Sequence, residues 1–155
     1  MTPDGDEAAV RRFVEQFAEN LVAAGMPRMP SRVFACLLVS PQGRLTAAEL
    51  AESLQVSPAA VSGAVRYLIQ VDLAARERLP GSRREVYRLY ANAWYEMMAS
   101  RDQMLARWVT TLGEGIEVLG ADSPGGRRLV ETRAFMQFLE EELEGLLERW
   151  RARNP

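Results

Sequence analysis

The stretch Thr46–Tyr90, TAAELAESLQVSPAAVSGAVRYLIQVDLAARERLPGSRREVYRLY, carries the pattern that decides the fold. The hydroxyl of Thr46 can cap a first helix, and Glu49 three residues later completes the pattern of a capping box. Ser57 can cap a second helix, with Pro58 at the first helical position, where a missing N–H is no loss. Two capped helices separated by a short turn predict a helix-turn-helix.

The second helix has two distinct faces. Its apolar residues repeat at helical spacing and are expected to face the core. The opposite face is made of small residues and one long cation, and these are the predicted DNA-reading residues: Ser57, Ala59, Ala60, Ser62, Gly63 and Arg66. Small side chains let a helix approach base edges and phosphates closely. Taken alone, a helical hairpin that only packs is an equally good interpretation.

The segment that follows decides between these interpretations. Leu73–Leu79 and Arg84–Tyr90 have the pattern of two strands around a turn at Pro80–Arg83. The hairpin carries the arginines predicted to bind DNA, which are Arg76, Arg78, Arg83 and Arg84, and Arg88 follows them. A hairpin that only packs has no use for so many guanidinium groups, whereas a wing lying along a phosphate backbone does.

The net charge of −2 argues at first against DNA binding. The charge is unevenly placed, however, because residues 28–90 hold nine arginines against five acids, a net +4. Residues 1–27 and residues 91–155 each carry a net charge of −3. The positive field is therefore confined to the predicted helix-turn-helix and wing, and the local field matters more for steering toward DNA than the total charge.

Several of these segments resemble the MarR (multiple antibiotic resistance) family of winged-helix regulators. Gly25–Arg32, GMPRMPSR, and Val56–Ser62, VSPAAVS, resemble its GbsR-like branch in particular. The wing signature of the family is Asp, any residue, then Arg, with Leu-Thr after five more residues. Ser82-Arg83-Arg84 fill the first three places here, and Tyr90-Ala91 stand where Leu-Thr is expected. The resemblance covers about residues 8–152 and maps the wing-tip arginine of the family to Arg84.

The expected fold is mainly α, a winged helix-turn-helix with a two-stranded β-wing and long N- and C-terminal dimerisation helices. Residues 1–155 are expected to form a single domain, with a DNA-binding lobe at about 28–90 and a dimerisation lobe at about 7–24 and 92–152. The family fold also implies a brief strand at Arg44-Leu45. The terminal helices carry broad apolar stripes that one copy of the small lobe cannot cover. Burial against a second copy is the simplest solution, and a monomer that folds the helices back is the alternative.

Composition indicates neither an enzyme nor a metal protein. The chain has no histidine and one cysteine, and it shows no nucleophile–base pair and no phosphate-binding glycine loop. We therefore expect no catalytic residue, no cofactor and no metal ligand. Cys36 lies in an apolar run and is interpreted as a buried thiol, with a redox sensor as the alternative. No apolar run approaches the length of a membrane span, so no membrane contact and a cytoplasmic location are expected.

These patterns predict a homodimer that binds a pseudo-palindromic site in double-stranded DNA. The family resemblance implies a transcriptional regulator, usually a repressor released by a small molecule. Large residues clustered at the predicted junction of the lobes are the candidate effector site: Phe13, Phe17, Met26, Tyr90, Trp94, Tyr95 and Met98, with Met29 beside them. A core that simply joins the lobes is the alternative for this cluster. A winged helix used only for protein–protein contact is the alternative for the whole chain.

Overall fold

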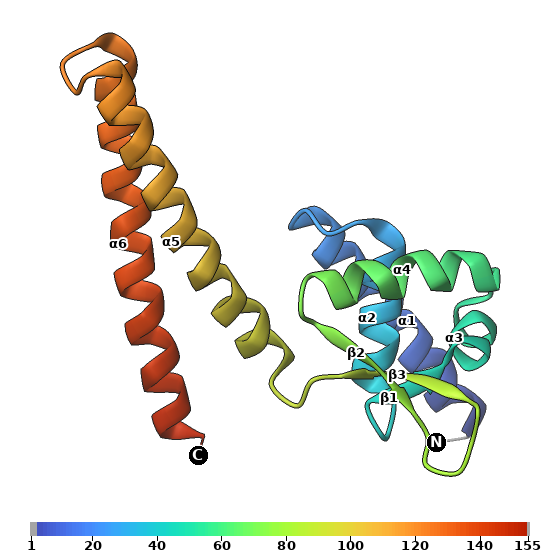
Figure 1. Ribbon diagram of the computed structural model, residues 1–155. Coiled ribbons are helices and arrows are strands. Elements are labelled where there is room, and N and C mark those ends of the chain that lie inside the picture. Colours follow the sequence, from blue (N-terminus) through green and yellow to red (C-terminus); the bar gives the residue numbers. More distant parts are fainter. Residues whose placement is uncertain (1–2, 155) are drawn as a thin grey trace. The chain divides into compact units, whose positions relative to one another are not determined.

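The computed structural model describes residues 3–154, which fall into two compact units divided between Ala93 and Trp94 (Figure 1). The elements of the first unit are α1 (Pro3–Ala23), α2 (Arg28–Val39), β1 (Arg44–Thr46), α3 (Ala47–Leu54), α4 (Pro58–Gln70), β2 (Ala74–Arg78) and β3 (Glu85–Leu89). The second unit is formed by α5 (Ala93–Leu119) and α6 (Pro124–Arg153). The mainly α fold predicted from the sequence is confirmed.

The three strands form one antiparallel sheet in the order β1-β3-β2. β2 and β3 are the two predicted wing strands, with Ala74 opposite Leu89 and Arg78 opposite Glu85. β1 adds a third strand on the other edge of β3, where Leu45 lies opposite Tyr87. The brief strand implied by the family resemblance therefore exists, and it ties the start of the helix-turn-helix to the base of the wing.

The helix caps predicted for the helix-turn-helix are confirmed. The Thr46 hydroxyl accepts a hydrogen bond from the Glu49 N–H at 3.2 Å, and the Glu49 carboxylate accepts one from the Thr46 N–H at 2.7 Å. The Ser57 hydroxyl accepts from the Ala60 N–H at 3.2 Å and caps α4. Between the two helices Gln55 adopts a left-handed conformation with φ of 53°, which turns the chain sharply enough to start α4.

The core of the first unit is built around α2, which packs against α1, α3 and α4. Its largest fully buried side chains are Phe34, Leu37, Leu50, Leu68, Leu73, Val33, Val61 and Val65. α2 begins at Arg28 and holds Pro30 in its first turn, where a proline removes no intrahelical hydrogen bond. α1 begins at Pro3, before the boundary at about residue 7 that the sequence predicts for the dimerisation lobe.

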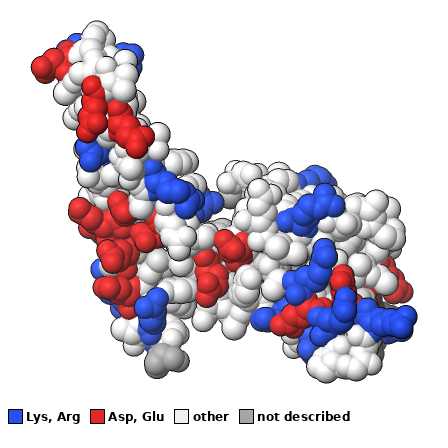
Figure 2. Space-filling view, viewed as in Figure 1, with Lys and Arg blue, Asp and Glu red and all other residues white. Residues whose placement is uncertain are grey.

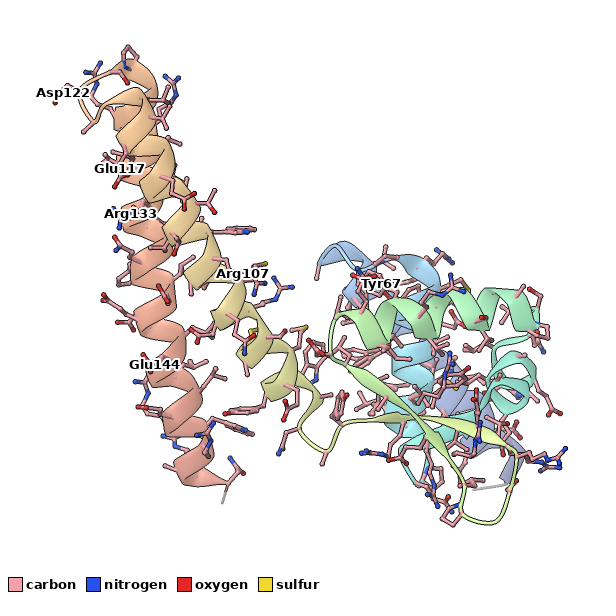
Figure 3. All side chains as sticks on the ribbon, viewed as in Figure 1. Tyr67, Arg107, Glu117, Asp122, Arg133 and Glu144 are labelled. Atoms are coloured by element: carbon pink, nitrogen blue, oxygen red, sulfur yellow. The ribbon has the colours of Figure 1, made fainter. Side chains whose placement is uncertain are left out.

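In the second unit α5 and α6 pack as an antiparallel hairpin (Figure 1). Glycines on α5 leave room for side chains of α6. A Cβ atom built on Gly113 would lie 3.4 Å from the guanidinium carbon of Arg133, labelled in Figure 3, and one built on Gly115 would lie 2.9 Å from a Leu129 methyl carbon. No helix within residues 3–154 is long and apolar enough to cross a membrane.

Candidate nucleic-acid interface

α4 exposes the residues that were predicted to read DNA. Ser57, Ala59, Ser62, Gly63 and Arg66 are exposed, and Ala60 is half-buried at the edge of the same face. The other face of α4 is formed by the buried residues Val61, Ala64, Val65 and Leu68. A Cβ atom placed on Gly63 would find no atom within 4 Å, so the exposed face is open at its centre. A double-stranded nucleic acid could approach the backbone of α4 closely at this point.

The arginines of the wing fall into two groups. Arg76 pairs with Glu85 at 3.7 Å, and Arg88 pairs with Glu77 at 2.8 Å, in both cases across β2 and β3. Arg76 and Arg88 also lie over the rings of Tyr87 and Tyr90, with distances of 5.8 and 6.0 Å to the ring centroids. These contacts partly neutralise both cations and hold them against the sheet. Sequence reasoning missed the pairs because it weighed the arginines without the strand register.

Arg78, Arg83 and Arg84 form the second group. Their side chains are exposed, and within residues 3–154 no ion pair is found for them. The Ser82 hydroxyl accepts a hydrogen bond from the Arg84 N–H at 3.0 Å, which fixes the turn just before β3. A carboxylate at position 82 could accept the same bond, so Ser82 can do locally what the aspartate of the wing signature would do.

Arg84 is electrostatically linked to the start of α3. The pKa of the Glu49 carboxyl is lowered, first by the hydrogen bond from the Thr46 backbone, then by the Thr46 hydroxyl, and also by the charge of Arg84. The wing and the first helix of the helix-turn-helix therefore share one local field. Figure 2 shows arginines gathered around the wing with a few carboxylates among them, whereas carboxylates dominate the visible face of the α5–α6 hairpin.

The residues predicted for an effector site are divided between the two units. Phe13 and Phe17 lie one turn apart on α1, with stacked rings and centroids 5.9 Å apart, and Met26 follows α1. Tyr90 lies beneath the Arg88 guanidinium. In the second unit, Tyr95 on α5 contacts Arg151 on α6 through a hydrogen bond and a cation–π contact, while Trp94 and Met98 belong to the first turns of α5.

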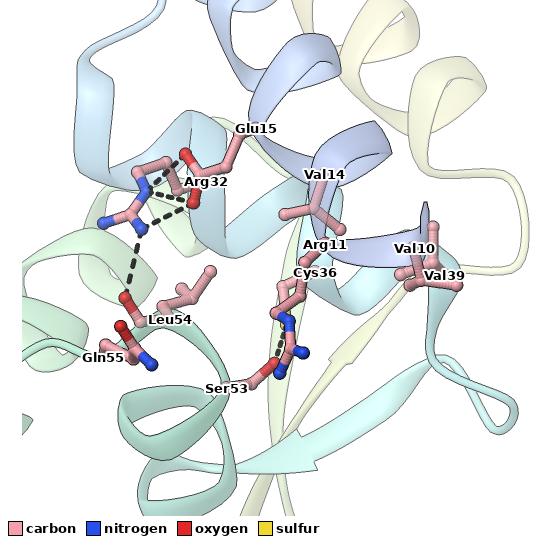
Figure 4. A pocket seen from close by; sticks show the side chains of 10 residues that line it. All are labelled: Val10, Arg11, Val14, Glu15, Arg32, Cys36, Val39, Ser53, Leu54 and Gln55. Carbon is pink, nitrogen blue, oxygen red and sulfur yellow. Dashed lines mark hydrogen bonds and ion pairs between the residues drawn. The ribbon is translucent and has the colours of Figure 1, made fainter. Parts of the chain in front are cut away.

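Cys36 lies in α2, where it is 5% exposed. Its sulfur is 3.5 Å from the Ser53 hydroxyl oxygen, and burial raises the pKa of the thiol. A cavity of about 280 Å³ lies beside it between α1, α2 and α3 (Figure 4). Within the part of the chain that the structure describes, no group of three His, Cys, Asp or Glu residues is placed to hold a metal ion.

One side chain at this cavity was not predicted as functional. Arg32 on α2 forms a bidentate ion pair with Glu15 on α1, with its shortest N–O distance at 2.6 Å. The same guanidinium donates to the Leu54 carbonyl oxygen at the end of α3. No sequence signal joins these residues, because the ion pair spans 17 positions between α1 and α2 and the bond to Leu54 spans 22 positions between α2 and α3.

Comparison with known proteins agrees with this geometry. Residues 24–85 match the sequence model of the MarR family, and residues 92–153 match that of MmpR5-like MarR family transcriptional regulators. The chain is 30% identical over 151 residues to the HTH-type transcriptional regulator MmpR5 of Mycobacterium tuberculosis, covering 97% of this chain and 92% of that protein.

Solved structures show the same fold. A crystal structure described as that of a transcriptional regulator has a TM-score of 0.82 and 29% identity, and the match covers 93% of this chain and 99% of that one. The archaeal chromatin protein TrmBL2 has a TM-score of 0.54 and 18% identity over 68% of this chain and 40% of that one. The sequence match over nearly the whole chain agrees with the winged helix and with the exposed face of α4. The chain belongs to the MarR family and is a DNA-binding transcriptional regulator, not an enzyme.

Proposed function

We propose that the chain acts as a homodimer that places α4 of each copy in the major groove and its wing on the adjacent minor groove. The exposed face of α4, with its open centre at Gly63 and a cation at Arg66, is the observation that carries the proposal. The wing would hold the backbone through Arg78, Arg83 and Arg84, whose side chains are exposed and for which no ion pair is found within residues 3–154. Arg76 would contribute less, because Glu85 offsets its charge.

The dimer follows from the apolar surface of the second unit. Phe135, Phe138, Leu146 and Trp150 on α6 are each about half exposed. Their spacing places them within an arc of about 120° on one side of the helix, where the half-buried Leu139 also lies and which the half-buried Leu143 borders. A second copy is the occupant that fits best, because a two-fold arrangement pairs each stripe with itself. Two reading heads related by such an axis favour a pseudo-palindromic operator with half-sites about one helical turn apart.

The test of the DNA contacts is Arg84→Ala, measured by fluorescence anisotropy on a DNA fragment that the wild-type protein selects from a random pool. We expect a loss of about 1–3 kcal/mol in binding free energy, the scale of one specific contact. Arg12→Ala on α1 removes the same charge from an exposed site outside the proposed interface and serves as the matched control. Unchanged affinity in folded Arg84→Ala would refute the assignment of the wing.

Repression in the cytoplasm, with release by an apolar or cationic small molecule, is the regulation that we infer from the resemblance. The stacked rings of Phe13 and Phe17 on α1 suit such a ligand, since ring faces attract quaternary ammonium groups. A thermal-shift screen of quaternary amines and hydrophobic aromatics, followed by DNA titration with each hit, tests this regulation. GbsR-like regulators are associated with choline-type compounds, so a choline-type hit would favour that branch over the MmpR5-like regulators.

A further inference from the structure

The side chain of Arg32 joins three helices of the first unit. Its Nε donates to one Glu15 carboxylate oxygen at 2.9 Å, and its Nη2 donates to the other at 2.6 Å. Nη2 also donates to the Leu54 carbonyl oxygen at 3.1 Å. The side chain is 19% exposed, so these bonds are only partly screened by water. Figure 4 shows the guanidinium between Glu15 and the end of α3.

The hydrogen bond from Arg32 to the Leu54 carbonyl lies at the end of α3, just before the turn of the helix-turn-helix. Leu54 is the last residue of α3, and carbonyl groups in the last turn of a helix lack partners within that helix. The next residue is Gln55, whose left-handed conformation turns the chain toward the Ser57 cap of α4. The Arg32 guanidinium therefore fixes the carbonyl group just before the turn at Gln55, and this turn sets the direction of α4.

The bonds of Arg32 matter more because the apolar packing around them is incomplete. α1 packs on α2, whereas the cavity of about 280 Å³ lies where α1 and α3 face each other. Val10 and Val14 of α1 line this cavity, together with Val39 of α2 and Leu54. Since apolar packing is incomplete at this place, the link from α1 to α3 through Arg32 is polar and directional.

We propose that Arg32 is a positioning residue for DNA recognition, which couples α1 to the orientation of α4 through Glu15 on one side and the Leu54 carbonyl on the other. The proposal rests on DNA reading by α4. Arg32 itself makes no contact with DNA. Any event that displaces α1 along α2 is transmitted to the turn between α3 and α4 through this guanidinium.

The decisive experiment compares Arg32→Ala with the reciprocal exchange Arg32→Glu plus Glu15→Arg. Arg32→Ala is expected to weaken binding to the selected DNA about tenfold, the scale of one lost charge-assisted hydrogen bond. The exchange restores an ion pair between α1 and α2 and should recover thermal stability. A carboxylate at position 32 cannot donate to the Leu54 carbonyl, so DNA affinity should stay low in the exchanged protein. Arg11→Ala, which removes the exposed pair with Glu7, should change neither quantity.

Two further measurements separate this proposal from the proposed function. The salt dependence of binding should be the same for Arg32→Ala and wild type, and a smaller slope would show instead that Arg32 contacts a phosphate. Amide exchange at Val56–Ala60 should be faster in Arg32→Ala without DNA, and unchanged exchange overturns the proposal even if the wild type fails to bind DNA. Recovery of DNA affinity in the exchanged protein would also overturn it, whereas failure of wild-type binding alone would refute the proposed function.

Discussion

Replacing Phe138 by alanine tests the proposed dimer directly, because this ring belongs to the exposed apolar stripe on α6. The ring is 55% exposed in the single chain. A phenylalanine presents roughly 200 Å² of surface, so about 110 Å² is available for burial against a partner. At about 25 cal/mol per Å², this area contributes about 2.8 kcal/mol per copy. The two copies of a symmetric dimer together lose about 5.5 kcal/mol, or roughly four powers of ten in Kd, as an upper limit.

Sedimentation equilibrium over a concentration series measures this loss. The wild type should sediment as two chains at micromolar concentration, and Phe138→Ala should dissociate at concentrations where the wild type remains paired. Val130→Ala is the matched control, because Val130 is 44% exposed on the same helix. It lies eight residues before Phe138, which is about 80° around the helix and away from the stripe.

The outcome is interpretable only if the α5–α6 hairpin survives in the variant. Helix content measured by circular dichroism should be the same for wild type and Phe138→Ala, because the replaced ring faces outward in the single chain. A wild-type mass of one chain, or an unchanged Kd in folded Phe138→Ala, would refute the assignment of this face. Charges at Leu139 or Leu143 are a poorer test, since these half-buried residues also support the single hairpin.

The other predictions concern single side chains. The Glu49 carboxyl has a lowered pKa in the folded chain, so it stabilises the fold above its unfolded pKa, and this stability is lost as the pH falls through the folded value. Glu49→Gln should therefore lower the unfolding free energy by up to about 1 kcal/mol at pH 7, and the difference from wild type should vanish once the pH lies below the folded pKa of the Glu49 carboxyl. A difference that persists after this carboxyl is fully protonated contradicts this origin. Burial raises the pKa of the Cys36 thiol, so iodoacetamide should react with the native chain far more slowly than with the unfolded chain at pH 7, and equal rates would mean that the thiol is accessible.

Local chemistry explains which parts of the fold could be predicted from the sequence. The Thr46 and Ser57 caps, the turn between them and the wing strands are each specified by residues within a few positions of one another. Capping and turn formation depend mainly on such neighbours, so the sequence is sufficient for them. The exposed face of α4 could be predicted for the same reason, because the apolar residues of this helix repeat at helical spacing.

Contacts between distant residues could not be predicted in this way. The pairs Arg76–Glu85 and Arg88–Glu77 depend on the register of β2 and β3, and the bonds of Arg32 depend on how α1, α2 and α3 pack. Register and packing are set by the sum of many weak interactions and leave no short pattern in the chain. The predicted dimerisation lobe, which groups residues 7–24 with residues 92–152, stays a prediction about the dimer. In the single chain α1 packs on α2.

The two kinds of wing arginine also bear on how the chain would recognise DNA. Arg66, Arg78, Arg83 and Arg84 can together make at most about eight phosphate contacts in a dimer. In that case a plot of log K for binding against log salt concentration should have a slope of about −7. The internally paired Arg76 and Arg88 add little to this slope. Residues 28–90 carry a net charge of only +4, so a few arginines rather than a large positive surface would hold the DNA backbone. Accurate placement of α4 must then supply more of the discrimination, which is why a residue such as Arg32, remote from DNA, can matter as much as one that contacts it.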